Sequence, residues 1–520
     1  MKYLNNIKMA RLLFLSLMIL GLSNCTDRWE DMNTDPTRLK TIPDEYLFTS
    51  AVRGAFNDAS SDLSITFGGQ YANIYLGSPW TRDIDKYNGL GNTDYAQMIF
   101  SGIYGSTIKN AVEVMHMTAP DGEYPNKWRN AQAQFMAILG FTKLTDAFGD
   151  VPYTEAGMGK YNITQPKYDT QEFIYNDMIE RLGNIIALLQ EDGAADHIYP
   201  AGIDPIYNGD LENWIRFANS YRLSLAMRAR FVKPEFENII KECFNLPLIE
   251  TNDQNPTLET TDDPNNTAMW NPWYYRWQEW ASGRAILNFS EKFIGTLRDT
   301  DDPRLPFFAL KVPDPDDPTD STYLGIPNGL IDEVLAQINR KERSAPSEHF
   351  FARDQPIFLL TAAKVQLYKA EALLFGIING EAPNDIYQKA VRLAMEQWKI
   401  DEDRISDYIA NQPEATLSGT DQEDDFRKIA TQMWITSVPN AFDGWTTIRR
   451  TGYPVIPQRT SPLLSPGITD GYMPTRILYP YTGEKSNNGD EMQKAIDRLP
   501  GGKDKIDIKL WWDVRDAQED

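Results

Sequence analysis

The sequence predicts a mainly α-helical protein whose helices come in pairs and are separated by long irregular loops. Three observations predict this class. Several segments repeat apolar residues at helical spacing, and neighbouring segments are joined by short turns rich in Gly, Pro and Asn. The remaining stretches are long and dense in Gly, Pro, Asn, Asp and aromatic residues, a ring content that argues for ordered, functional loops. These loop-rich blocks are residues 60–95, 246–282, 297–329 and 452–502.

The first 24 residues predict a lipoprotein signal peptide. Three basic residues among the first eleven precede an apolar run from Leu12 to Ser23, which is too short to span a membrane. The run ends in Leu-Ser-Asn-Cys, which is typical of a bacterial lipobox cleaved before Cys25, although Asn24 stands where Gly or Ala is usual. Acyl chains on Cys25 would make residues 25–45 a membrane tether. The alternative is an ordinary secretory signal with an incidental cysteine.

Charge and cysteine content restrict the function further. The formal net charge is −23, and removal of a signal with three basic and no acidic residues takes it to −26. Such a field repels nucleic acid and anionic lipid, so we expect no nucleic-acid partner. The chain holds two cysteines, Cys25 and Cys243. If Cys25 is lipidated, Cys243 has no disulfide partner, and we interpret it as a buried structural thiol.

Six segments after the tether have apolar residues at the spacing of an amphipathic helix. Two of them are close neighbours joined by the turn NGEAPND, in which Asp385 is placed to cap the second helix. The predicted helices are Trp128–Phe148, Glu172–Leu189, Asn213–Val232, Phe358–Ile378, Ile386–Trp398 and Asp425–Val438.

Alanines recur inside the two neighbouring helices. Small side chains allow two helices to approach closely, which is how tetratricopeptide hairpins stack. No 34-residue self-similarity can be read from the sequence, so it predicts degenerate helical repeats, with a generic helical bundle as the alternative. The alanines are Ala362, Ala363, Ala370 and Ala372 in the first helix and Ala390 and Ala394 in the second.

Recognisable catalytic motifs are absent from the sequence. Its three histidines, His116, His197 and His349, form no HExxH motif, and it contains neither a GxSxG elbow nor a P-loop. We interpret the acidic run Asp314–Thr322 as a solvated loop rather than a calcium site, because it lacks the glycine and glutamate of an EF-hand. We therefore predict no catalytic residue, metal or cofactor. A surface hydrolase with an unrecognised carboxylate pair remains a remote alternative.

A series of separated motifs resembles the SusD/RagB family of outer-membrane nutrient-binding lipoproteins, in its SusD-like branch. Each motif is weak alone, but their order spans nearly the whole mature chain. One departure is that the AEA helix continues as Leu-Phe-Gly, where the family usually has Arg-Gly. Besides Cys25, the motifs are Asn33–Pro36, Phe148–Ala156, Leu223–Arg230, Asp302–Pro306, Gly325–Gly329, Tyr368–Gly376, Ile448–Pro454, Arg476–Pro480 and Trp511–Asp513.

The resemblance implies a single domain, residues 46–520, of tetratricopeptide-like helix pairs with irregular loops forming the binding surface. It also implies a non-enzymatic role at the cell surface of a Gram-negative bacterium. The protein would be anchored by lipid in the outer membrane and would deliver an oligosaccharide to a SusC-type TonB-dependent transporter. An oligopeptide ligand with the same role is the alternative, for which a groove lined by Asn, Gln and offset charges would be expected.

Ligand-binding residues have to be sought in this chain's own aromatic loops. The stretch WNPWYYRWQEW, Trp270–Trp280, puts six rings into eleven positions beside short polar groups, which suits stacking against sugar rings. The stretch Tyr71–Gly89 is a second candidate. Spacings of three and four between the tryptophans also indicate a helical stripe, so we expect about half of the rings in the first stretch to pack inward. The predicted ligand-binding residues are Trp270, Trp273, Tyr274, Trp277, Trp80 and Tyr75.

Overall fold

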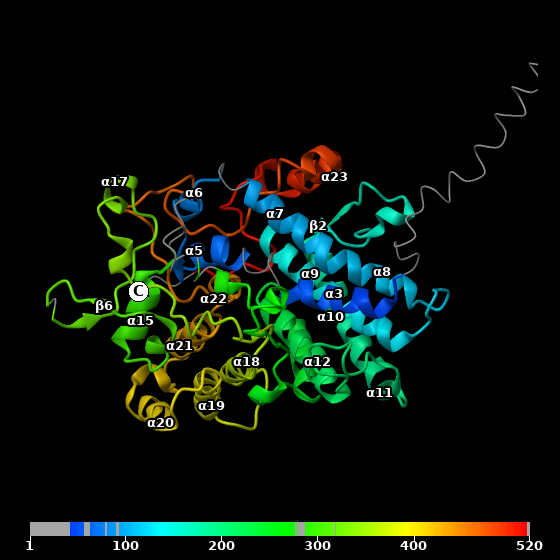
Figure 1. Ribbon diagram of the computed structural model, residues 1–520, viewed down its shortest axis with the longest axis horizontal. Helices are drawn as coiled ribbons and strands as arrows, with labels where there is room; N and C mark the ends of the chain where they lie inside the picture. Colours follow the sequence, from blue (N-terminus) through cyan, green and yellow to red (C-terminus); the bar gives the residue numbers. More distant parts are fainter. Residues whose placement is uncertain are drawn as a thin grey trace, which may run out of the picture. The chain divides into compact units, whose positions relative to one another are not determined.

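The computed structural model describes residues 42–56, 63–77, 81–89, 93–275, 278, 287–317 and 319–516, and Asp44–Asp520 form one compact unit. Figure 1 shows that the protein is mainly α-helical, as predicted. No helix in this part of the chain is both long and apolar enough to cross a membrane. The helices are α3 (Asp44–Phe56), α5 (Gly69–Tyr71), α6 (Arg82–Asp85), α7 (Thr93–Ile103), α8 (Lys109–Met117), α9 (Lys127–Phe148), α10 (Gln171–Leu189), α11 (Ala194–His197), α12 (Leu211–Ala229), α13 (Phe236–Phe244), α15 (Glu291–Asp299), α16 (Leu305–Phe308), α17 (Asp332–Leu335), α18 (Ala362–Leu374), α19 (Pro383–Glu396), α20 (Glu402–Asn411), α21 (Gln422–Ile435), α22 (Ala441–Thr451) and α23 (Glu484–Arg498).

Strands in the described residues are short and serve to join loops. Each has two residues, and they form antiparallel pairs between segments that can be far apart in sequence. The pairs are β1 (Tyr75–Leu76) with β5 (Asn288–Phe289), β2 (Val151–Pro152) with β3 (Tyr168–Asp169), β4 (Thr257–Leu258) with β8 (Ile357–Phe358), and β6 (Val312–Pro313) with β7 (Ser321–Thr322).

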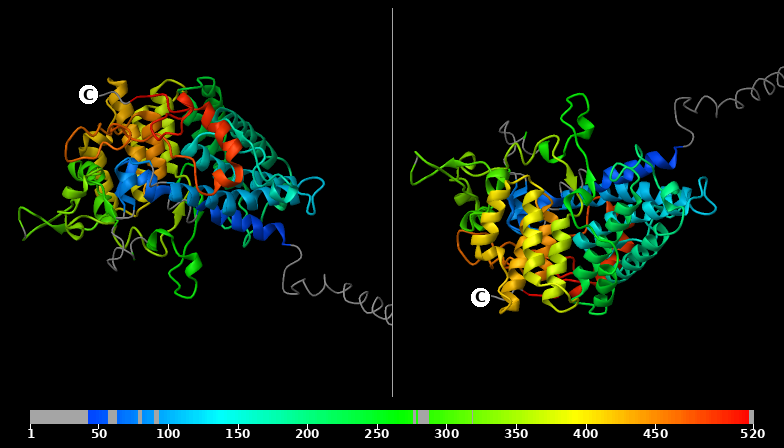
Figure 2. Two further views of the ribbon diagram at one scale, coloured as in Figure 1. Left: turned by 90° about the horizontal axis from the view of Figure 1, so that it is seen from above. Right: turned by 90° about the horizontal axis from the view of Figure 1, so that it is seen from below.

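The longer helices pack in succession as hairpins. Helix α8 packs on α9, α9 on α10, and α10 on α12; α12 in turn contacts its hairpin partner α13 and also α18. Helix α18 forms the next hairpin with α19 and packs on α21, which packs on α22. Figure 2 shows these hairpins side by side, with the irregular loops on the other side of the unit. This arrangement is the predicted scaffold of tetratricopeptide-like helix pairs.

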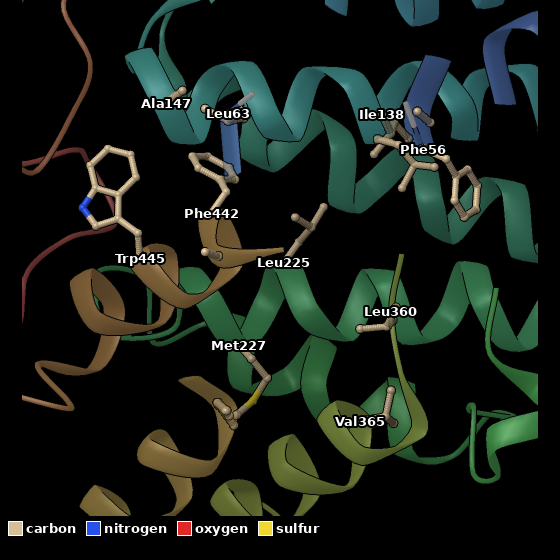
Figure 3. Close-up of a cluster of buried hydrophobic side chains, with 14 of the residues drawn as sticks. Phe56, Leu63, Ile138, Ala147, Leu225, Met227, Leu360, Val365, Phe442 and Trp445 are labelled. Atoms are coloured by element: carbon tan, nitrogen blue, oxygen red, sulfur yellow. The ribbon is translucent and has the colours of Figure 1, made fainter. Parts of the chain in front are cut away.

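The core is a continuous apolar cluster that connects these helices. Figure 3 shows Phe56 of α3 beside Ile138 of α9, and Leu225 and Met227 on opposite sides of α12. The alanines of α18 and α19 belong to this core, with Ala363, Ala370 and Ala390 completely buried. Small side chains therefore do allow the close helix approach that the sequence indicates. Cys243 is also buried, and burial raises the pKa of its thiol to about 12.

Capping side chains mark where α9 and α18 begin, and the prediction was close for the first helix only. Helix α9 begins one residue earlier than predicted, and Asn126 caps it by accepting from the backbone N–H groups of Trp128 and Arg129. The prediction for α18 began four residues too early. Phe358 lies in β8, and the helix starts only after Thr361, whose hydroxyl accepts from the N–H of Lys364. The apolar run Ile357–Leu360 continues the helical pattern of the sequence, but its first two residues form β8.

Charged residues of the sequence motifs are buried as ion pairs that hold helices together. Glu371 of α18 is fully buried and pairs with Arg230 and Arg450. Arg304 of the DPRLP motif pairs with Asp302 and also donates to Gln432 of α21. Arg476 pairs with Asp504. Buried charged side chains need partners because an unpaired buried charge costs free energy. The charged residues of these sequence motifs therefore serve contacts within the scaffold.

Asp146 is the centre of a second buried network at the end of α9. Its carboxylate accepts from Tyr175 at 2.5 Å and Trp512 at 3.0 Å, and it pairs with Arg228. Arg449 stacks between the rings of Trp445 and Trp512, 3.6 and 4.8 Å from their centroids. The C-terminal tryptophan motif therefore packs on the helical core through Trp512.

Asp513, next in the chain, makes stability depend on pH. Burial raises the pKa of its carboxyl to about 7, although Arg449 and Lys509 favour the charged form. The folded state thus holds this proton more tightly than the unfolded chain, and unfolding releases it between about pH 4 and pH 7. The stability that Asp513 contributes is present at low pH and is lost as the pH rises through this window.

Asp513→Asn is expected to increase the free energy of unfolding by about 2 kcal/mol at pH 8 and to change it little at pH 4. Urea denaturation at the two pH values measures the difference, with the exposed Asp507→Asn as the matched control. An equal effect of Asp513→Asn at both pH values would contradict this assignment.

Candidate functional site

The aromatic stretch is positioned by contacts with a segment some eighty residues later in the chain. Strand β4 pairs with β8, which brings residues 259–275 beside residues 350–356. The backbone N–H of Asn271 donates to the carbonyl of Arg353 at 2.8 Å, and the Thr260 hydroxyl donates to that of Gln355 at 2.9 Å. Backbone and side-chain hydrogen bonds therefore join these two loops at the base of the site.

Asn271 determines which rings face inward. Its buried side chain donates to the carbonyl of Gln355 at 2.5 Å and accepts from the N–H of Trp273 at 2.8 Å, which starts a helical turn. The rings that follow, Trp273 and Tyr274, are only 3% and 8% exposed. Asn271 thus acts as an N-cap that turns these two rings into the protein.

Trp273 lines a small cavity. The cavity has a volume of about 50 Å³ and is lined also by Lys364 and Asp443, which form an ion pair, and by Asn440. This volume holds a few water molecules but no sugar ring. The indole N–H of Trp273 lies 3.5 Å from the carbonyl of Pro439. We therefore regard Trp273 as a packing residue, which corrects the prediction that its face is available to ligand.

Trp270 and Tyr275 present their rings at the surface. Tyr275 is 44% exposed and Trp270 is half-buried, and their ring centroids are 6.1 Å apart. The Trp270 indole N–H donates to the carbonyl of Asp263 at 2.9 Å, which fixes the ring. We call Trp270 and Tyr275 the aromatic platform.

Arg353 supports the platform from below. Its guanidinium carbon lies 4.4 Å from the centroid of Trp270 and 4.7 Å from that of Tyr274, and it donates to the Tyr274 hydroxyl at 2.9 Å. These cation–π contacts stiffen both rings. Tyr274 therefore acts beneath the platform rather than in it, which corrects its predicted role. The exposed carboxylates of Asp262, Asp263 and Asp354 lie on the same two loops and offer hydrogen-bond acceptors.

The second predicted aromatic stretch belongs mainly to the core. Tyr75 is completely buried in β1, where its ring packs on Phe289 at 5.3 Å; Tyr71 and Tyr87 are buried as well. The prediction that Tyr75 contacts a ligand conflicts with this burial, because strand pairing with β5 turns the ring inward. Trp80 and Trp277 lie outside the described residues, and their ligand contact stays a prediction.

Sequence reasoning missed Arg353 and left Tyr275 out of the candidate residues. No local pattern could indicate Arg353, because it reaches the site through the pairing of β4 with β8. Tyr275 carried a usable signal, since it lies within the ring-dense stretch Trp270–Trp280. The described site thus combines a rigid aromatic face with hydrogen-bonding groups, and no group of three or more metal-ligating side chains occurs in the described residues.

The structure combines a scaffold of helix hairpins with an aromatic platform on its loops. The chain belongs to the SusD-like family, described as starch-binding and associating with the outer membrane, whose model matches residues 36–480. No curated protein matches the chain.

Solved structures of the family share the fold over nearly their full length. A structure named chitin-binding protein is 28% identical, with a TM-score of 0.76, over 91% of this chain and 99% of its own. A SusD homologue from Bacteroides uniformis is 26% identical, with a TM-score of 0.75 and the same coverage. A chitin-binding SusD homologue from Flavobacterium johnsoniae has a TM-score of 0.76 over the same shares of the two chains but 21% identity, and it supports the fold alone.

Proposed function

We propose that the protein is a cell-surface lipoprotein that captures a neutral oligosaccharide and delivers it to a SusC-type TonB-dependent transporter of the outer membrane. The observation that carries the proposal is the aromatic platform, Trp270 and Tyr275, in a member of the SusD-like family; Arg353 packs against the Trp270 ring. The name of the 28% identical structure, a chitin-binding protein, supports a glycan as the ligand.

The platform suits a sugar for a physical reason. Sugar rings present faces of C–H groups with slightly positive hydrogens, and these lie well on the negative face of an indole or phenol ring. Rings that are already fixed lose little conformational entropy on binding. Trp270 is held by Asp263 and Arg353, so this ring of the platform is preorganised.

Charge favours neutral over anionic glycans. The net charge of −23 repels uronates and sulfated sugars, while the exposed Asp262, Asp263 and Asp354 can accept hydrogen bonds from sugar hydroxyls. The proposal is of binding without bond cleavage, in agreement with the family description as starch-binding.

The membrane anchor and the transporter complete the proposed role. Lipid on Cys25 would tether the folded unit to the outer membrane through residues 25–45. Incorporation of labelled fatty acid into the full-length protein, and its loss in Cys25→Ser, tests the anchor. An unchanged label in the variant would remove Cys25 as the lipidation site.

Calorimetric titration tests the ligand class. The secreted part of the chain, residues 26–520, is titrated with chitohexaose, maltohexaose, a polygalacturonate oligomer and a neutral peptide of similar size. We expect micromolar to millimolar binding of a neutral glycan and weaker binding of the anionic one. If only the neutral peptide binds, the ligand in the proposed function is an oligopeptide and not an oligosaccharide.

A further inference from the structure

We propose that a cleft between the helix hairpins α12–α13 and α18–α19 binds an extended acidic peptide segment. This site is separate from the aromatic platform and uses different residues. The cleft has a volume of about 600 Å³, within the range of sites that hold small ligands or a few peptide residues. One side of the cleft is formed by the end of α13 and the residues after it. The other side is formed by α18, the turn after α18, and α19.

The cleft exists because the two hairpins are fixed to each other by their inner helices. Helix α12 packs on α18, and Arg230 at the end of α12 pairs with the buried Glu371 of α18. The cleft lies beside this contact, lined by α13 on one side and α19 on the other. Figure 1 shows the two hairpins as neighbours, α12 in green and α18 and α19 in yellow. A cleft between packed helices is preformed, so the protein loses little conformational entropy when a ligand binds.

The lining has an apolar floor and an amide that lacks a partner. Leu248, Val365 and Ile377 form the buried floor. Gln366 lies beside them and is 3% exposed, and its carbonyl oxygen accepts no hydrogen bond from any described residue. A buried polar atom without a partner is costly, and a peptide N–H supplies the missing donor. The rim carries two further amides, Asn245 and Asn379.

The charges at the cleft point to a ligand with carboxylates. Lys241, Lys369 and Lys389 line it, whereas the protein as a whole is strongly acidic. Lys369 pairs with Glu381, while Lys241 and Lys389 form no ion pair with a described residue. Glu250 is the other carboxylate of the lining. Three ammonium groups against two carboxylates leave a net positive cleft, to which an acidic segment is complementary.

The chemistry of the lining favours a peptide over a sugar. Phe244 is the single aromatic residue that lines the cleft, so there is no stacking face comparable to the aromatic platform. Amides from Gln366, Asn245 and Asn379 match the alternating donors and acceptors of an extended backbone. The lysines at the rim match acidic side chains on such a backbone.

Titration with a defined peptide tests the proposal. The probe is the blocked pentapeptide acetyl-Ala-Glu-Ala-Glu-Ala-amide, with its glutamine counterpart as the neutral control, added to residues 26–520. We expect dissociation constants of roughly 1 mM or below for the acidic peptide and about tenfold weaker binding of the neutral one. The double variant Lys241→Glu, Lys389→Glu is expected to bind the acidic peptide more weakly than the wild type, by about tenfold or more. Gln366→Leu is expected to lower the affinity for both peptides.

A matched charge reversal separates the cleft from the general field of the protein. Lys341→Glu with Lys503→Glu changes two exposed lysines outside the cleft and is expected to leave the affinity unchanged. Equal weakening by both pairs, equal binding of the two peptides, or no binding at about 10 mM peptide would overturn the proposal. The cleft variants are expected to bind chitohexaose with the affinity of the wild type. The proposal of glycan binding is therefore tested independently of the proposal of peptide binding in the cleft.

Discussion

Glu371→Ala is expected to lower the free energy of unfolding by about 3–5 kcal/mol, because it leaves two guanidinium groups buried without a counter-charge. Arg450 binds the Glu371 carboxylate through two hydrogen bonds of 2.7 Å, and Arg230 donates to it at 2.9 and 3.1 Å. Burial by itself would raise the pKa of Glu371, but Arg450 and Arg230 hold it below its usual value. The carboxylate is thus charged at neutral pH and connects α12, α18 and α22.

Two further variants separate charge from packing. Glu371→Gln keeps the shape of the side chain and is expected to lose most of the same stability, since the charge is what the arginines require. The triple variant Glu371→Leu, Arg230→Met and Arg450→Met removes all three charges and is expected to be more stable than Glu371→Ala. Chemical denaturation followed by circular dichroism gives the comparison.

A surface carboxylate provides the control for this prediction. Glu212 pairs with Arg216 on the exposed side of α12, and its side chain is 71% exposed. Glu212→Ala is expected to change the free energy of unfolding by less than about 1 kcal/mol. If Glu371→Ala also lowers the free energy of unfolding by less than about 1 kcal/mol, the buried ion pairs of Glu371 with Arg230 and Arg450 do not hold the helices together.

Trp270→Ala combined with Tyr275→Ala is expected to weaken binding of the neutral oligosaccharide by about a hundredfold or more. Each ring supplies contact area at little entropic cost, and loss of a central aromatic contact costs about 2 kcal/mol. Both rings lie at the surface, and Arg353 keeps its contact with Tyr274, so the fold is expected to persist. Calorimetry with the preferred glycan measures the affinity, and the thermal midpoint verifies folding.

Two controls locate the effect at the platform. Tyr472→Ala removes a ring that is 56% exposed on a different loop, and it is expected to leave the affinity unchanged. Trp273→Phe alters a buried ring beneath the platform and is expected to lower stability by about 1–2 kcal/mol without changing affinity. Wild-type affinity in the double platform variant would exclude Trp270 and Tyr275 as the binding surface.

The scaffold was predictable because its signals are local. The apolar spacing of α9 predicts the helix to within one residue, and the alanines of α18 and α19 predict their close approach. The predicted start of α18 was wrong because the residues just before Thr361 are apolar like the helix, although the first two of them form strand β8.

The site was predictable only in outline. Its loop could be identified from its density of rings, but which rings face outward depends on Asn271 and on a backbone contact with Arg353. The burial of Tyr75 depends on pairing with β5, more than two hundred residues away in sequence. The sequence motifs likewise identified Glu371 and Arg450 without revealing that they meet in the core.

A structure of the protein with its bound oligosaccharide tests the central claim most directly. We predict an intact sugar ring lying flat on the indole of Trp270, about 4 Å from it, with a neighbouring unit on Tyr275 and hydroxyls donating to nearby carboxylates. A ligand seated elsewhere with both rings uncovered, or a ligand recovered cleaved, would contradict the account.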